Sequence, residues 1–180
     1  MKRLVSILAV ALLASGCANP LNRVTMDRYA QTCRDAEQNG RMEVAEEACR
    51  RALINVRIGN LGPELESQEL YNLGRIKRQL GKHAEAEEIY RESLRIQESL
   101  PNPDQGKIGR RLAELSIVIG EQKKFKDAWP VLSRLMPISE GYSGHEREVV
   151  KAIFSKYADE YDKLRMPTEA ELLRKKANAL

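Results

Sequence analysis

Apolar residues recur at helical spacing through the middle of the chain, with charged residues between them. Leu70, Leu73, Ile76 and Leu80 follow one another at intervals of three, three and four residues. This spacing places their side chains on one face of an α-helix. A second run, over residues 86–96, has the same character and follows the turn residue Gly81. The pattern predicts a helix, a tight turn and a second helix.

This helix–turn–helix pattern recurs with a period of about 42 residues. Four segments align on a small residue at Ala45, Ala86, Ala128 and Ala170, which are 41, 42 and 42 positions apart. A non-repetitive helical bundle with coincidental alanines is the alternative, but Gly and Pro clusters fall where units or helices should end. The predicted repeat domain covers residues 25–180, with units at about 25–63, 64–103, 104–143 and 144–180.

The second unit resembles a tetratricopeptide repeat. The resemblance rests on Leu73-Gly74, Leu80-Gly81, Ala86, Tyr90 and Ser93-Leu94, and the 42-residue period resembles that of kinesin light chains. It implies an all-α fold, an α-solenoid of about four helix–turn–helix repeats wound as a right-handed superhelix.

Two local sequence features carry further expectations. Pro130 lies two residues after Ala128, so the second helix of the third unit should start late or be kinked. Thr168 and Glu171 have the spacing of a capping box for the last helix.

Composition and charge support a helical chain and argue against several classes of protein. Of the 180 residues, 42% are hydrophobic and only 5% aromatic, and the abundant Leu, Glu, Lys and Arg are helix formers, so we expect no sheet. The formal charge is +4, from 30 basic and 26 acidic residues. Two basic residues fall in a predicted leader, which leaves 28 − 26 = +2. This small, evenly mixed charge gives no sign of nucleic-acid binding.

The first residues have the pattern of a bacterial secretory signal. Lys2 and Arg3 precede an apolar run from Leu4 to Ala14, and small residues lead to Cys17. Eleven residues of helix span about 16 Å, too short for a bilayer core of ~30 Å. Residues 1–16 are therefore predicted to be a removable signal peptide. Residues 17–24 are predicted to be a tether.

Leu13-Ala14-Ser15-Gly16-Cys17 resembles the lipobox of bacterial lipoproteins, in which the cysteine receives diacylglycerol and an N-acyl chain. The resemblance implies a lipid anchor on Cys17. Because Ala18 rather than Asp follows the cysteine, it also implies an outer-membrane location facing the periplasm. An ordinary secretory signal with an incidental cysteine is the alternative. No other cofactor is expected.

The remaining two cysteines fall in paired positions of the first unit. Facing residues of an antiparallel helix pair have position numbers with a constant sum, which sets Gly74 against Tyr90 in the second unit and Cys33 against Cys49 in the first. Because exported chains meet an oxidising compartment, we expect a Cys33–Cys49 disulfide. Two free buried thiols are the alternative.

Sequence signatures of catalysis are missing. The chain has no Gly-rich phosphate loop, nucleophile elbow or His-Glu-x-x-His helix. His83 and His145 do not fall at metal-ligand spacing, and the carboxylates alternate with basic residues as on solvated helix faces. We therefore expect no enzymatic activity, no metal and no small-molecule substrate.

Stacked helical repeats offer the surface of their first helices to a peptide or a partner helix. By resemblance, Asn72 matches an asparagine that bonds a ligand's backbone. The arginines at positions 34, 75, 78 and 110 predict a basic groove suited to an acidic segment or a C-terminal carboxylate. The predicted groove residues are Gln31, Arg34, Gln68, Tyr71, Asn72, Arg75, Arg78, Arg110, Glu114 and Ile117, with Ser155 and Asp159 from the fourth unit. Solvated residues on an unoccupied face are the alternative.

These features together predict a lipid-anchored periplasmic adaptor that binds other envelope proteins or peptides and touches the membrane only through its lipid. Pilotins, outer-membrane assembly components and adaptors of cell-wall hydrolases have this architecture. An accessory or glycan-binding subunit of an envelope enzyme, or a self-assembling structural lipoprotein, are the alternatives.

Overall fold

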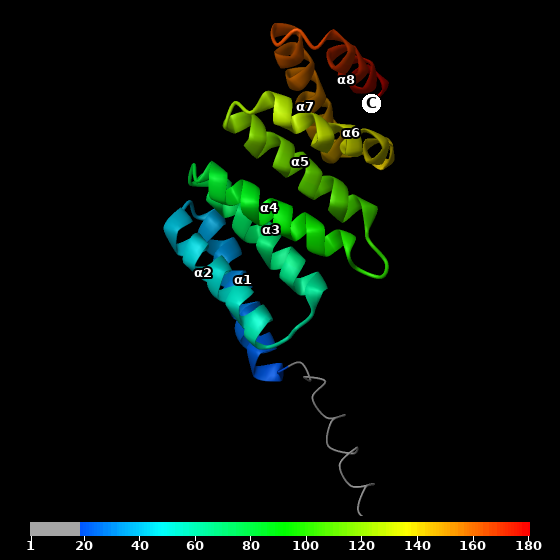
Figure 1. The fold of residues 1–180 in the computed structure, drawn as a ribbon. Coiled ribbons are helices and arrows are strands. Elements are labelled where there is room, and N and C mark those ends of the chain that lie inside the picture. Colours follow the sequence, from blue (N-terminus) through cyan, green and yellow to red (C-terminus); the bar gives the residue numbers. More distant parts are fainter. Residues whose placement is uncertain (1–18) are drawn as a thin grey trace, which may run out of the picture.

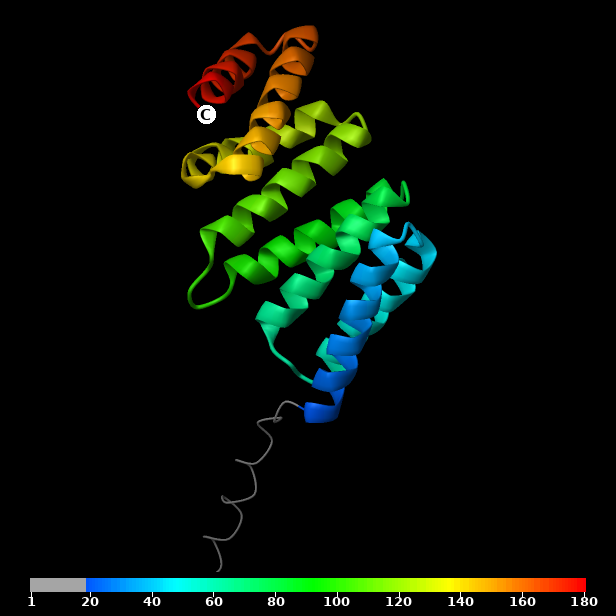
Figure 2. The same ribbon diagram turned by 180° about the vertical axis from the view of Figure 1, so that it is seen from behind.

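The computed structural model describes residues 19–180, which form eight α-helices, two short 3₁₀ helices and no strand. Figures 1 and 2 show the helices as hairpins stacked in chain order, with α1 at one end and α8 at the other. The predicted all-α solenoid is confirmed. The helices are α1 (Pro20–Gln38), α2 (Met42–Ile58), α3 (Pro63–Gln79), α4 (His83–Glu98), α5 (Gln105–Glu121), η1 (Phe125–Ala128), α6 (Trp129–Ile138), η2 (Ser139–Gly141), α7 (Gly144–Lys163) and α8 (Pro167–Ala179).

One backbone conformation closes all four hairpins. Gly40, Gly81, Lys123 and Arg165 have φ angles of 69°, 73°, 59° and 58°, and lie 41, 42 and 42 residues apart. Glycine adopts this left-handed conformation freely, whereas a residue with a Cβ adopts it at a cost of roughly 1 kcal/mol. The backbone therefore repeats the same turn conformation in every unit, even in the two units that lack glycine at the turn.

The aligned alanine is fully buried in every unit. Ala45, Ala86, Ala128 and Ala170 are each 0% exposed. A side chain no larger than a methyl group lets two helices approach closely, and a larger one would overpack the contact.

In the first two units, the residues predicted to face each other across the antiparallel helix pair are in contact. A Cβ added to Gly74 would lie 2.8 Å from Cε1 of Tyr90, so the missing side chain makes room for the ring. In the equivalent positions, Cys33 and Cys49 are buried and joined by a disulfide with their Cα atoms 5.2 Å apart.

The second helix of the third unit is interrupted, as Pro130 predicted. A 3₁₀ turn, η1, precedes α6, which has a proline near its start and Pro137 inside it. The capping box expected for α8 is wrong. The helix begins at Pro167 and its N-cap residue is Met166, with no side-chain cap, so Thr168 already lies inside the helix.

The start of the chain also differs from expectation. Helix α1 begins at Pro20, with Asn19 capping it by accepting from the Leu21 N–H at 3.0 Å. The Asn19 N–H donates to the Gly59 carbonyl at 2.9 Å and fixes this helix end to the end of α2. The prediction of a tether through residue 24 is therefore wrong for residues 20–24.

Two further expectations concern the chain before Asn19. The predicted signal peptide and Cys17 lie outside the described residues. Within residues 19–180, no helix combines the length and apolar character needed to cross a bilayer.

Candidate functional site

The first helices of the second, third and fourth units, α3, α5 and α7, enclose a hollow of about 360 Å³. We call it the α3–α5–α7 hollow. Because three successive units contribute side chains to it, its shape depends on how the units stack. It is lined by Tyr71, Arg75, Arg110, Ala113, Glu114, Tyr142, His145, Glu146, Val149 and Val150.

Four predicted groove residues line this hollow, namely Tyr71, Arg75, Arg110 and Glu114. Six do not. Gln31 and Arg34 lie on α1, where Arg34 donates to the Gln31 side chain at 2.6 Å. Ile117 packs against the hydrophobic core. The remaining three, Gln68, Asn72 and Arg78, lie on α3 outside the lining.

The fourth unit contributes a part of the chain that the sequence reasoning missed. Its lining residues are Tyr142, His145, Glu146, Val149 and Val150, whereas the alanine register pointed to Ser155 and Asp159. The missed positions follow the spacing of one helix face, which was a readable signal. They come earlier in the chain because the first turn of α7 lies against α5, where Glu146 pairs with Arg110 at 3.0 Å.

The expected basic groove must be corrected. Of the four arginines at predicted groove positions, three form ion pairs with glutamates of neighbouring first helices, so positive and negative charges alternate along this surface. Partly exposed pairs contribute little stability, but they remove the net positive charge that would select an acidic ligand. The pairs are Arg75 with Glu37 of α1, Arg78 with Glu114 at 3.2 Å and Glu121 at 3.1 Å, and Arg110 with Glu146 at 3.0 Å.

A buried arginine lies behind the hollow. Arg111 is 1% exposed, and its guanidinium carbon is 5.2 Å from the centroid of the Tyr71 ring. Its N–H groups donate to Ser93 Oγ at 2.8 Å and to the carbonyls of Ser67 and Lys107 at 3.2 and 2.9 Å, all of them neutral. Burial lowers the pKa of Arg111 to about 10, which leaves it charged at neutral pH. This cation–π contact favours the observed position of the Tyr71 ring in the lining of the hollow.

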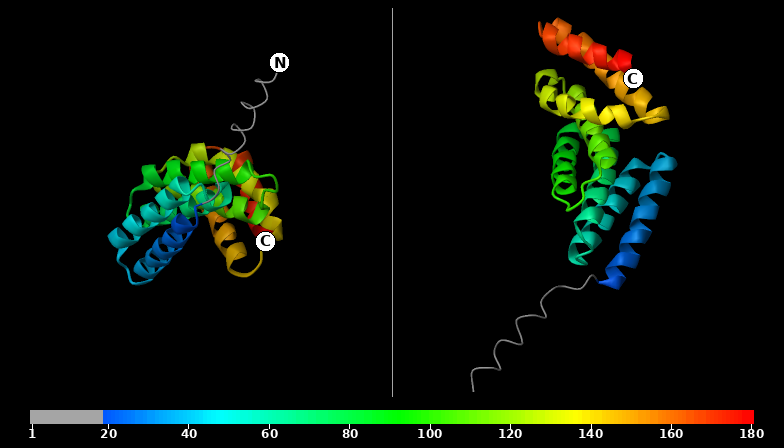
Figure 3. Two further views of the ribbon diagram at one scale, coloured as in Figure 1. Left: turned by 90° about the horizontal axis from the view of Figure 1, so that it is seen from below. Right: turned by 90° about the vertical axis from the view of Figure 1, so that its right-hand side faces the viewer.

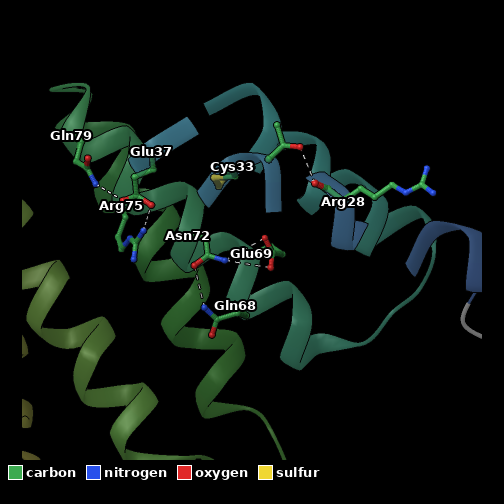
Figure 4. The surroundings of a disulfide bond; sticks show 10 residues. Arg28, Cys33, Glu37, Gln68, Glu69, Asn72, Arg75 and Gln79 are labelled. Atoms are coloured by element: carbon green, nitrogen blue, oxygen red, sulfur yellow. Dashed lines mark hydrogen bonds and ion pairs between the residues drawn. A yellow bond between two sulfur atoms is a disulfide. The ribbon is translucent and has the colours of Figure 1, made fainter. Parts of the chain in front are cut away.

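Asn72, predicted to bond a ligand's backbone, is already engaged within α3. Its Oδ1 accepts from Gln68 at 3.2 Å, and its Nδ2 lies 3.4 Å from both carboxylate oxygens of Glu69. Figure 4 shows this chain of side chains beside the disulfide cysteine Cys33, with Arg75 and Gln79 reaching Glu37 next to it. Asn72 would have to exchange these bonds to hold a ligand.

Within residues 19–180, Glu69 is the carboxylate of this group that forms no ion pair, whereas Glu37 pairs with Arg75. It is 5% exposed, and its hydrogen bonds to Asn72 are long. Burial raises its pKa, and the hydrogen bonds from Asn72 and the charge of Arg34 offset the increase only in part. Sequence reasoning passed over Glu69 because it reads as one more charged helix residue.

We expect Glu69→Gln to raise the free energy of unfolding at neutral pH. A carboxyl with a raised pKa in the folded state binds its proton more tightly there, so wild-type stability falls as pH rises from the usual pKa near 4.5 through the folded value. The variant lacks this loss, so its advantage should vanish below about pH 4. Urea unfolding at pH 4 and pH 7 measures it. Glu43→Gln, at an exposed position, is the control, and equal responses of both variants would contradict the assignment.

The sequence of the chain matches the profile of a known protein family. The sequence profile described as "Tetratricopeptide repeat" matches residues 29–99 and 66–140, together more than half of the chain. The chain belongs to the tetratricopeptide-repeat family. Repeats of this family bind other proteins or peptides, and the fold is typically a non-catalytic scaffold. No curated protein matches the chain in sequence.

Solved tetratricopeptide-repeat structures share the fold at low sequence identity. BtubC (BKLC) from P. vanneervenii has a TM-score of 0.73 at 19% identity, over 88% of this chain and 63% of BtubC, so this chain spans less than two thirds of that protein. A kinesin-light-chain-type protein of Podosopora anserina with nearly identical TPR-like repeats has a TM-score of 0.66 at 18% identity, over 86% and 74% of the two chains. A second structure of that protein, of a substituted form, gives 0.67 at 17%, over 96% and 80%.

The family membership therefore accounts for the stacked helices. The chemistry of the hollow depends on the particular side chains of this chain. In the described part of the chain, no group of three or more His, Cys, Asp or Glu side chains could hold a metal ion. What the hollow offers is two tyrosines, two valines and paired charges of both signs. Such a surface suits a peptide segment with an apolar anchor and mixed polar neighbours.

Proposed function

We propose that the chain is a lipid-anchored adaptor on the periplasmic side of the bacterial outer membrane, and that its α3–α5–α7 hollow holds a segment of another envelope protein. The hollow itself is the observation that carries the binding role, because three units converge on it with aromatic and charged side chains. The basic start, apolar run and Cys17 of the leader support the anchor and the location.

The chemistry of the lining narrows the class of partner. Arg110 and Glu146 already neutralise each other, so a uniformly acidic segment gains little there. Tyr71, Tyr142 and Val149 supply apolar contact area, and tyrosine does so at low cost in side-chain entropy. We expect a segment that carries an aromatic or aliphatic anchor residue flanked by both signs of charge.

Site-specific photocrosslinking in cells tests this function. A photoreactive residue at position 110, where the arginine side chain is 47% exposed, should capture a defined envelope protein. Position 50 on α2, with a similar exposure of 54%, is the matched control outside the hollow and should not capture it. Capture of the same protein from position 50 but not from position 110 would contradict the proposal.

A further inference from the structure

Exposed apolar side chains gather where α1 starts and α2 ends. Leu21, Val24 and Ile58 are 77%, 52% and 73% exposed. Leu21 and Val24 are three residues apart on α1, so they share one face of the helix. We call these three residues the N-terminal apolar patch.

Hydrogen bonds join the start of α1, which carries Leu21 and Val24, to the end of α2, which carries Ile58. Asn19 N–H donates to the Gly59 carbonyl at 2.9 Å, and Asn22 Nδ2 donates to Asn55 Oδ1 at 3.3 Å. A Cβ on Gly59 would lie 2.5 Å from Cβ of Asn22, so the helix ends are in close contact. Leu21 and Ile58 are each the chain neighbour of a residue in this contact.

The position of Cys17 indicates what covers the patch. Cys17 precedes Asn19 by two residues. Because consecutive Cα atoms are 3.8 Å apart, two residues of chain reach at most about 8 Å from Asn19. A lipid on Cys17 therefore brings a membrane surface to the N-terminal apolar patch. We propose that Leu21, Val24 and Ile58 insert into the lipid interface and orient the solenoid on it.

This inference rests on the lipid anchor of the proposed function and goes beyond it, since the anchor alone leaves the orientation free. Nearby charges do not replace the apolar contact. Arg23 pairs with Asp27 at 3.2 Å, and Arg57 with Glu66 at 2.7 Å and Glu92 at 2.9 Å. Because these arginines are neutralised, the contact should depend little on salt or on anionic lipid.

The docked orientation has a consequence for the hollow. In Figure 1 the start of α1 lies at one extreme of the stack and α8 at the other, and the right-hand view of Figure 3 shows the same order. With the patch on the membrane, α3, α5 and α7 follow at increasing distance from it. The α3–α5–α7 hollow is then presented to the periplasm at a fixed height.

Tryptophan quenching by brominated lipid tests the contact. The chain has one tryptophan, Trp129, so Trp129→Phe gives a silent background. Leu21→Trp and Ile58→Trp are introduced singly into the full chain, which is processed in cells, purified with its lipid and reconstituted in phosphatidylethanolamine–phosphatidylglycerol vesicles. Leu172→Trp, on α8 with 46% exposure, is the matched control at the far end.

Emission from positions 21 and 58 should shift to shorter wavelength and be quenched, more by bromines near the headgroup than by bromines near the methyl ends, since an interfacial contact is shallow. Emission from position 172 should not change. Vesicle-bound, lipid-modified protein with no quenching at positions 21 and 58 overturns the inference and leaves the anchor intact. If those positions are instead shielded by a second copy, quenching is again absent and the molar mass in detergent doubles.

Failure of the proposed anchor gives a different result. Protein from cells fed radioactive palmitate would then carry no label and would not float with vesicles. That outcome removes the basis of both proposals, whereas label and flotation without quenching remove only the docking.

Discussion

Removing the Cys33–Cys49 disulfide is expected to lower the free energy of unfolding by about 3 kcal/mol. The bond closes a loop of 17 residues, from a sequence separation of 16, and in the chain-entropy model a loop of this size restricts the unfolded chain by that amount. The loss is large against the 5–15 kcal/mol that stabilises a typical domain. Urea unfolding of the Cys33→Ala, Cys49→Ala double variant measures it.

Wild-type protein in reductant is the matched control and should unfold like the double variant. A second comparison concerns the location of the effect. The disulfide joins α1 to α2, so its loss should increase hydrogen exchange most in the first unit, which lies nearest the predicted anchor. Wild-type protein that yields two alkylatable thiols without reduction would contradict the disulfide.

Tyr90→Ala is expected to cost about 3–5 kcal/mol, the range for truncating a large buried aromatic side chain. Tyr90 is 0% exposed, its ring lies 6.0 Å from that of Tyr71, and its hydroxyl donates to Glu114 at 3.2 Å. Its loss leaves a cavity between α4 and α3 beside Gly74 and removes a ring contact of Tyr71, which lines the hollow. Denaturant unfolding measures the effect, with Tyr29→Ala at a partly exposed position as the control.

The effect of Gly74→Ala on the free energy of unfolding should change sign when Tyr90 is removed. In the wild type, Gly74→Ala should destabilise, because the new Cβ meets the Tyr90 ring at 2.8 Å. In the Tyr90→Ala background the obstruction is gone, so the same change should stabilise by up to about 1 kcal/mol through helix propensity. Destabilisation of similar size in both backgrounds would show that the two residues do not pack against each other.

The sequence predicted the backbone well because its signals are local. Helical spacing around Leu70 and Leu73, a glycine at Gly40 and Gly81, and a proline at Pro130 each act within one turn or one hairpin. The left-handed turns at Lys123 and Arg165 could not be read from their own residue types, since neither favours that conformation. Their place in the 42-residue period was the usable signal.

The groove chemistry was harder to predict because it depends on pairing between units. Arg75 meets Glu37 across 38 positions, and Arg110 meets Glu146 across 36. The register of the aligned alanines places the arginines on the correct face of their helices. It does not identify which side chain of the neighbouring unit lies against each arginine. For the same reason it predicted a basic surface where the structure has alternating charges.

The fourth unit shows a third limit. The sequence put its groove residues at the alanine register, yet the structure uses Tyr142, which precedes α7, and His145 in the first turn of α7. In the structure the first turn of α7 lies against α5, where Glu146 pairs with Arg110 at 3.0 Å. The alanine register does not indicate where one first helix contacts the next, so it placed the lining residues too late in the chain.

The most direct test of the central claim is the affinity of the captured envelope protein for the purified, lipid-modified chain with its hollow filled. Val149→Trp places a large side chain in the hollow from a partly exposed position, and Val44→Trp makes the same change on α2, where Val44 is 47% exposed and outside it. The account predicts a dissociation constant at least tenfold higher for Val149→Trp, about 1.4 kcal/mol, and no change for Val44→Trp. Full affinity with the hollow filled would contradict it.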